Sequence, residues 1–408
     1  MKALTKISLG FLSLAAVALW FTSCSSEDVA SGTNQGRKSL LTLSINTGNV
    51  NNTRANDWIG SAPTDESKIQ SMTVGIFTSE GKVRTIVELK AGSGVGTKLS
   101  DDGQTATIVT TQLTSTDKVL VAVNAVEGKF QGVQTADDFK GKTVEADVAL
   151  CAGAEKETQD VSKTPMFGSG DLKNTEGETK DKNFTASVKV YHMLSKVHLQ
   201  ALNVQFNENG AFKDASFTPT DIFMINVPND VKFNVTSNTD ASAWTNTSTF
   251  LHGWSNDAYS DANASASGMG AYKKYLTTGA LTPTELKGTS GSFGKDVYFY
   301  TLPNGKTELA NRTKLVIAGT FKNNTSDAGT KVYYPVPINA KFDNSGNVTA
   351  AGDGTTVYAV YPNRVYNCTV NIKAKGASTP NESLDPQTAS VTVTVEPYDS
   401  ADQITNFE

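Results

Sequence analysis

Cysteine and histidine would be the easiest residues of this chain to assign to chemistry, and both are scarce. The three cysteines, Cys24, Cys151 and Cys368, are too few and too scattered for a disulfide framework or a CxxC metal site. The last two either pair or, as we favour, stay reduced and buried in strands. The chain has three histidines: His192, His198 and His252. None has HExxH spacing, so we expect structural histidines, no metal and no cofactor.

Cys24 stands at the end of a short export signal. Lys2 and Lys6 precede the apolar run 7–21, which is too short to span a bilayer as a helix and fits a secretion signal. The sequence FTSC at 21–24 resembles a lipobox, after which the cysteine is acylated. We expect residues 1–23 to be a signal peptide and Cys24 to be lipidated in an outer-membrane precursor; the alternative is an ordinary signal with a chance cysteine. Acidic residues at 27–28 resemble a Bacteroidales surface-export signal or form a solvated tether.

Other patterns argue against an enzyme and against a nucleic-acid binder. The stretch GSGVGTK at 92–98 has the wrong residue order for a phosphate loop, and no GxSxG nucleophile elbow is present. The formal charge is −5, and no block of Lys and Arg interleaves with aromatic residues. We expect no catalytic residue and no nucleic-acid partner, although a dispersed carboxylate pair of a glycosidase would leave no local signature.

Strands are the predicted elements of this chain. Its 408 residues are 38% apolar and 19% charged, which favours an all-β exported protein of two domains after a leader. Alternating or apolar runs separated by turn residues occur at 72–77, 106–110, 119–123, 144–150, 188–191, 197–206, 222–227, 297–302, 315–321, 332–338 and 365–372. They indicate two β-sandwiches, at 55–192 and 193–408. The segment 237–294, with Trp244 and Trp254, is interpreted as a surface insertion or an adhesive loop.

A leading strand precedes the first sandwich. Leu41, Leu43 and Ile45 alternate with polar residues, so one face of this strand is predicted to be buried. The polar, turn-rich stretch 48–57 follows, where a protease would find an accessible backbone at Arg54.

The C-terminal region contains a second alternating strand at 389–396. One face presents four apolar residues: Ala389, Val391, Val393 and Val395. The polar stretch 375–387 before it contains two prolines and is predicted to be an extended connector able to carry the strand away from its own domain.

Several stretches together resemble the fimbrillins of the type V pilus, the major and minor fimbrial subunits of Bacteroidales, over nearly the whole chain. They are MTVGIF at 72–77, VLVAVNA at 119–125, PMFG at 165–168, VKVYHMLSKV at 188–197, YFYTLPN at 298–304 and VYYPV at 332–336. His192 stands where the family tends to have Arg. The loop-like PMFG stretch is similar to a family loop, and the resemblance implies two tandem transthyretin-like β-sandwich domains.

The resemblance also implies a maturation route. An Arg-specific protease would cut between Arg54 and Ala55, making residues 24–54 a propeptide whose leading strand is displaced. The C-terminal donor strand of another subunit, about 388–408, would then fill the groove, and such head-to-tail contacts give filaments. Expected partners are identical subunits, fimbrial anchor and tip proteins, the protease, and host or bacterial surface ligands.

The expected function is therefore a structural pilus subunit, of the stalk, extracellular in the mature fimbrium and supporting adhesion or biofilm formation. A second interpretation keeps the leading strand permanently in place and lets the C-terminal strand close its own domain. The chain would then be a non-polymerising surface glycan-binding or adhesin lipoprotein, with Trp244 and Trp254 as a sugar-stacking platform.

Overall fold

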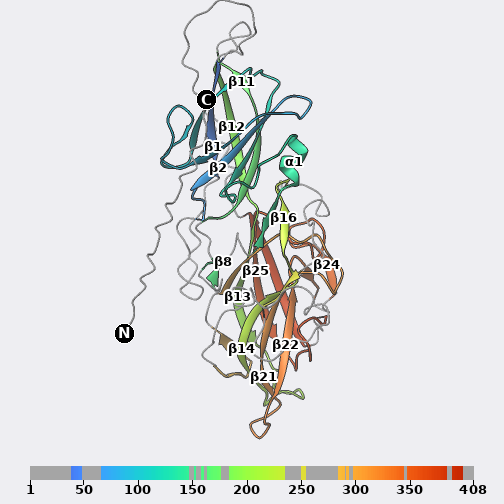
Figure 1. The fold of residues 1–408 in the computed structure, drawn as a ribbon. Helices are drawn as coiled ribbons and strands as arrows, with labels where there is room; N and C mark the ends of the chain where they lie inside the picture. The colour runs from blue at the N-terminus through green and yellow to red at the C-terminus, as the bar shows by residue number, and fades with distance from the viewer. Residues whose placement is uncertain are drawn as a thin grey trace, which may run out of the picture. The chain divides into compact units, whose positions relative to one another are not determined.

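The structure is a computed structural model of the chain. It describes residues 38–47, 66–146, 151–152, 158–159, 163–175, 183–234, 250–253, 284–289, 291–293, 297–343, 347–383 and 388–397. The described residues all belong to one compact unit. The described residues are mostly in strands, with one short helix, and their several sheets are consistent with two β domains (Figure 1).

The first half of the compact unit is built on one nine-stranded sheet. Its strands are β1 (Lys38–Asn46), β2 (Ser71–Phe77), β3 (Val83–Lys90), β4 (Lys98–Leu99), β5 (Thr105–Thr111), β6 (Lys118–Val123), β10 (Met166–Asp171), β11 (Lys173–Asn174) and β12 (Asn183–His192). Their order is β3-β2-β6-β10-β12-β1-β5-β4, with β11 also on β12. Alternate residues of β1, β2, β5, β6 and β12, together with Met166 of β10, meet in a common apolar core.

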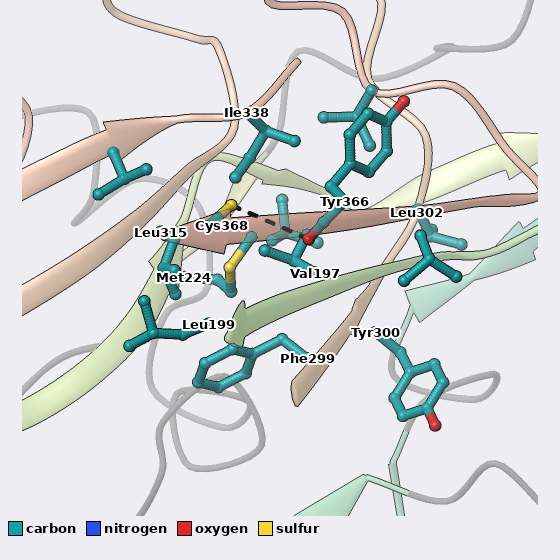
Figure 2. Packing of buried hydrophobic residues seen from close by; sticks show 14 of the residues in the cluster. Val197, Leu199, Met224, Phe299, Tyr300, Leu302, Leu315, Ile338, Tyr366 and Cys368 are labelled. Atoms are coloured by element: carbon teal, nitrogen blue, oxygen red, sulfur yellow. Dashed lines mark hydrogen bonds between the residues drawn. The ribbon is translucent and has the colours of Figure 1, made fainter. Parts of the chain in front are cut away.

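Two sheets form the second half. One contains β19 (Ser292–Phe293), β13 (Ser195–Val204), β25 (Arg364–Ile372) and β26 (Ala389–Pro397), with β20 (Val297–Thr301) also on β13. The other contains β18 (Leu286–Lys287), β14 (Ser216–Ile225), β21 (Lys314–Lys322) and β22 (Thr330–Pro337). Figure 2 shows their shared core, where Met224, Leu315 and Cys368 pack together. Short pairs are β15 (Val227–Pro228) with β17 (Phe250–Leu251), β23 (Lys341–Phe342) with β24 (Val348–Ala350), and β8 (Cys151–Ala152) with β9 (Thr158–Gln159).

The two halves are joined directly. β12 runs into β13 through Met193 and Leu194, both 0% exposed. β7 (Thr143–Glu145) of the first half pairs antiparallel with β16 (Asp230–Lys232) of the second. The ring of Phe233 lies 5.2 Å from that of Phe130, so one apolar core includes residues of both halves.

Most predicted strands are present, and two local features differ from the predictions. Of the predicted strand 144–150, residues 144–145 belong to β7, which pairs with the second half, and residues 147–150 lie outside the described residues. The stretch 165–168 is not a loop, because β10 begins at Met166. The helix α1 (Ala136–Gly141) was not predicted; it is six residues long and starts at a capping box between Thr135 and Asp138.

Candidate functional site

β1 lies inside the first sheet rather than at its edge. It pairs in parallel with β12, from Leu40 opposite Asn183 to Asn46 opposite Lys189, and antiparallel with β5, from Lys38 opposite Thr111 onward. Its backbone is therefore hydrogen-bonded along both sides. A short strand with two ladders leaves two unpaired strand edges if it is removed.

The inner face of β1 fills the core of the first half. Leu41 and Leu43 are 0% exposed and Ile45 is 5% exposed. Ser39 is the fourth inward residue and is also buried. The predicted displaced strand thus exists as a strand with the predicted face buried, and each of its three apolar side chains contributes about 1.5 to 3 kcal/mol by burial.

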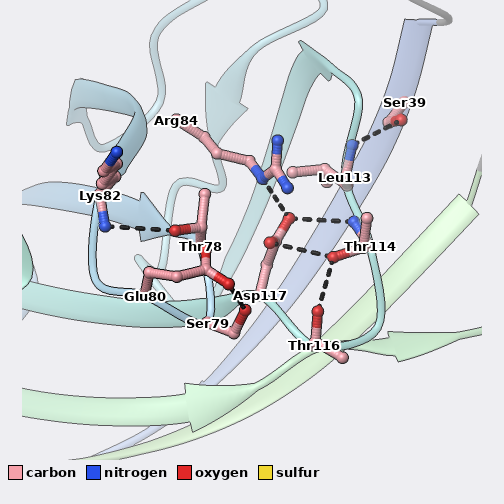
Figure 3. Close-up of polar contacts among 10 residues, drawn as sticks. All are labelled: Ser39, Thr78, Ser79, Glu80, Lys82, Arg84, Leu113, Thr114, Thr116 and Asp117. Carbon is pink, nitrogen blue, oxygen red and sulfur yellow. Dashed lines mark hydrogen bonds and ion pairs between the residues drawn. The ribbon is translucent and has the colours of Figure 1, made fainter.

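A rigid loop closes the Ser39 end of β1 (Figure 3). The backbone N–H of Leu113 donates to the Ser39 hydroxyl oxygen at 3.4 Å. The loop is held by the buried carboxylate of Asp117, which accepts hydrogen bonds from the Thr114 N–H at 2.9 Å and the Thr114 hydroxyl at 3.0 Å. Arg84 Nε lies 2.6 Å from the same carboxylate, so the charge of Asp117 is paired.

Residues 66–71, on the other side of the expected cleavage site, are anchored without help from β1. The Glu66 carboxylate lies 2.9 Å from Lys196 Nζ on β13, and the Tyr300 hydroxyl donates to it as well. Asn124, in the left-handed region at φ 55°, accepts hydrogen bonds from the Gln70 and Ser71 N–H groups at 2.9 and 3.3 Å. Its amide nitrogen donates to the carbonyls of Lys68 and Thr164. Loss of β1 would leave all these contacts in place.

The predicted donor strand is β26, and in this structure it lies on its own domain. It pairs antiparallel with β25, from Ala389 opposite Ile372 to Pro397 opposite Arg364, and is the last strand of that sheet. The side chains of Ala389, Val391 and Val393 are buried, and Val395 is partly buried. Val393 stands opposite Cys368, a buried free thiol whose pKa burial raises to about 12.

The connector before β26, predicted to be extended and able to carry the strand away, is bonded to the second half over its described part. Ala377 and Tyr333 exchange two backbone hydrogen bonds of 2.9 Å. The buried Lys314 ammonium donates to the Asn381 carbonyl at 2.9 Å and to its side-chain oxygen at 2.6 Å. Residues 373–383 are therefore fixed to the second half.

The remaining predicted site residues lie outside the described residues: Cys24, Arg54, Ala55, Cys151 as a side chain, Trp244 and Trp254. Within the described part of the chain, no group of three or more His, Cys, Asp or Glu could hold a metal ion. Likewise, no helix in that part is long and apolar enough to cross a membrane. His198 stacks on Tyr298 and bonds Asn367, as a structural histidine would.

Comparisons with known proteins support the resemblance seen in the sequence. Residues 41–192 match the family model described as major fimbrial subunit protein (FimA). That family is structural, not enzymatic, and its match begins on β1. A search of curated proteins gives no match.

Solved structures share the fold at low sequence identity. A fimbrilin (FimA) from Porphyromonas gingivalis W83 aligns with TM-score 0.56 and 17% identity over 90% of this chain and 99% of that one. A candidate cell adhesion protein from Bacteroides eggerthii aligns with TM-score 0.56 and 19% identity over 90% and 98%. Another candidate cell adhesion protein, from Parabacteroides distasonis, aligns with TM-score 0.57 and 15% identity over 88% of this chain and 99% of that one.

Proposed function

We propose that this chain, matched by the major fimbrial subunit family over residues 41–192, is a stalk subunit that polymerises by exchanging β1 for the β26 of another copy. The mature protein would be extracellular in a fimbrium and made of two transthyretin-like sandwiches. Its partners would be identical subunits, anchor and tip proteins and an Arg-specific protease. The main support for this proposal is that β1 is a buried strand paired on both sides. The inward residues of β26 follow the same alternation as those of β1.

The two inward patterns align residue by residue. If β26 takes the place of β1 in the same direction, Ala389 replaces the small Ser39, and three valines replace the larger residues. The replacements are Val391 for Leu41, Val393 for Leu43 and Val395 for Ile45. Each costs about 0.5 to 1.5 kcal/mol, whereas a shift of two residues would put Ala389 in the Leu41 position at about 2 to 5 kcal/mol. The unshifted register is favoured.

The inserted strand is proposed to run in the direction of β1, because the reverse direction would put the small Ala389 in the place of the larger Ile45. The tail would leave its own domain after residue 383, because Ala377 and Asn381 fix the preceding residues to the second half. Such contacts repeat head to tail and give a filament.

The groove would offer the tail a second ladder in addition to apolar burial. In its own sheet β26 is an edge strand with one described ladder, on β25. In the place of β1 it would pair with both β12 and β5. Each additional ladder hydrogen bond contributes about 0.5 to 1.5 kcal/mol net, so the second ladder offsets the cost of uncovering β25 in the tail's own domain.

Maturation would free the groove in two steps. Lipidation of Cys24 would hold the precursor at the outer membrane, and cleavage between Arg54 and Ala55 would separate β1 from the rest of the fold. The anchors at Glu66 and Asn124 support this proposal, because they hold the start of the mature chain when β1 is gone. The cut would then remove one strand and leave the remaining sheet in place.

N-terminal sequencing of protein purified from the cell surface, with an unboiled gel, tests the proposal. A start at Ala55 together with heat-sensitive multimers is expected. A lipidated start at Cys24 with monomer alone would contradict it and favour the glycan-binding or adhesin interpretation instead.

A further inference from the structure

The two ends of β1 are held in the groove by different chemistry. At one end the inward residue is Ser39, buried but polar, and it accepts the Leu113 N–H at the long distance of 3.4 Å. At the other end the inward residue is Ile45, only 5% exposed, and its N–H donates to the Gln104 carbonyl at 2.8 Å. Peeling from the Ser39 end therefore exposes no apolar side chain at the first step, whereas peeling from the Ile45 end does.

The subsite around Ser39 is held in shape by its own loop. Gln112 has φ 58°, a conformation that residues other than glycine rarely adopt. The three bonds to Asp117 fix Thr114 and Arg84 around it, and Leu113 is itself buried. Because these contacts involve no atom of β1, the Leu113 N–H keeps pointing at position 39 whichever strand lies there (Figure 3).

We propose that strand exchange starts at this Ser39 subsite and that its incoming occupant is the Ala389–Ser390 end of the tail of a second copy. This inference rests on the proposed function. In the register above, Ala389 is the first inward residue that the arriving tail presents, and it meets the end of β1 that opens without apolar exposure. Displacement then proceeds through the positions of Leu41, Leu43 and Ile45 in that order.

The chemistry of this subsite also predicts that residue 389 of the tail sets the rate of insertion. Ser39 offers an oxygen to the Leu113 N–H, and Ala389 offers none. The tail is thus a poorer occupant of the starting position than the strand it displaces. A hydroxyl at position 389 would supply the missing acceptor and make the first contact last longer.

Truncated tail peptides test the direction of exchange. The full chain is cut with an Arg-specific protease, and fluorescent peptides with the sequences of 388–397, 391–397 and 388–394 are added. Insertion is followed by fluorescence anisotropy. We expect loss of the Ala389 end to slow association about tenfold, and loss of the Val395 end to leave association within about threefold while speeding dissociation. The opposite pattern, or equal effects on association, would overturn the proposal.

Single substitutions in the full-length peptide give an independent readout. Ala389→Ser should insert about threefold faster or more, while the matched Ser390→Ala, on the outward face, should not change the rate. An unchanged rate for Ala389→Ser would contradict the subsite. If the unaltered peptide never inserts into cut, folded protein, both the proposed strand exchange and this inference are contradicted. If it inserts but loss of the Val395 end slows association more than loss of the Ala389 end, only this inference is contradicted.

Discussion

Asp117 carries the polar contacts that shape the end of the groove. Its side chain is 0% exposed, and Arg84, its ion-pair partner, is 24% exposed. Asp117→Asn keeps the size but removes the charge and at least one acceptor, so the free energy of unfolding should fall by about 1 to 3 kcal/mol. Urea denaturation measures this loss.

A surface pair supplies the control for Asp117. The side chains of Lys118 and Asp171 are 60% and 71% exposed, and Lys118 Nζ lies 2.6 Å from Asp171 Oδ1. Solvent therefore screens their attraction. Asp171→Asn should change the free energy of unfolding by less than about 0.5 kcal/mol. Equal losses for both variants would show that burial of Asp117 is not what matters.

Asp230 predicts a pH effect of definite sign. Burial raises the pKa of its carboxyl group, the Glu145 charge opposite it on β7 adds to this, and Lys232 and Lys129 oppose it. The folded chain then binds this proton more readily than the unfolded chain, so the ionised carboxylate disfavours folding above the raised pKa. Asp230→Asn should stabilise the protein at neutral pH, and the gain should shrink as the pH falls through that pKa.

Asp138 is the control with the opposite sign. The hydroxyl of Thr135 and the Gln134 N–H lower the pKa of its carboxyl group at the start of α1. Its ionised form therefore favours folding above the ordinary pKa, and that contribution is lost as the pH falls through the lowered one. Asp138→Asn should destabilise at neutral pH. Melting temperatures of both variants and the wild type from pH 3 to 8 measure these changes. A destabilised Asp230→Asn or a stabilised Asp138→Asn at neutral pH would contradict the prediction.

At the scale of elements, β1 and β26 differ in how well they fill the same positions. The Leu41 and Leu43 positions are fully buried, and valines of the tail would leave a methylene unfilled at each. A tail peptide with Val391→Leu should bind the cut protein more tightly by about 0.8 kcal/mol, roughly fourfold. Competition anisotropy measures the ratio. Thr392→Val, on the outward face, is the control, and a comparable gain there would refute the register.

The alternation of β1 and β26 made both strands predictable from sequence, since a strand with one buried face has a period of two. β10 was not recognised because its pattern is interrupted by glycine. A Cβ atom on Gly168 would lie 2.3 Å from the Lys189 carbonyl of β12, so close pairing of the strands requires glycine there. The contact of Lys314 with Asn381 joins residues distant in sequence, which no local pattern reveals.

For the molecule as a whole, contacts between the halves predict joint unfolding. Phe233 of the second half is 1% exposed and lies against Phe130 and Phe167 of the first. Calorimetry of the wild-type chain should show one transition. Phe233→Ala should lower the free energy of unfolding by about 3 to 5 kcal/mol. It should also make the two halves melt in separate transitions. Phe184→Ala, within the core of the first half alone, should lower the single transition without splitting it.

Polymerisation demands that β26 leave its own domain, and the native Cys368 allows that step to be blocked. Val393 is its partner across the β25–β26 ladder, and both side chains are buried on the same face. Antiparallel partners have Cα separations of about 4.5 to 5.5 Å, which a disulfide spans. Val393→Cys, in a Cys151→Ser background, should therefore form a disulfide with Cys368 on oxidation during folding and hold the tail in place.

The locked subunit should be cut normally but add no heat-stable multimers, and reduction should restore them. The high pKa of the Cys368 thiol means that the disulfide has to form before the core closes, so the protein is folded under oxidising conditions. Thr394→Cys is the matched control, because residue 394 is exposed on the outer face and cannot reach Cys368. A tail bound covalently to its own domain cannot fill a groove in another subunit. Multimers from the oxidised Val393→Cys protein would therefore show that β26 is not the donor strand.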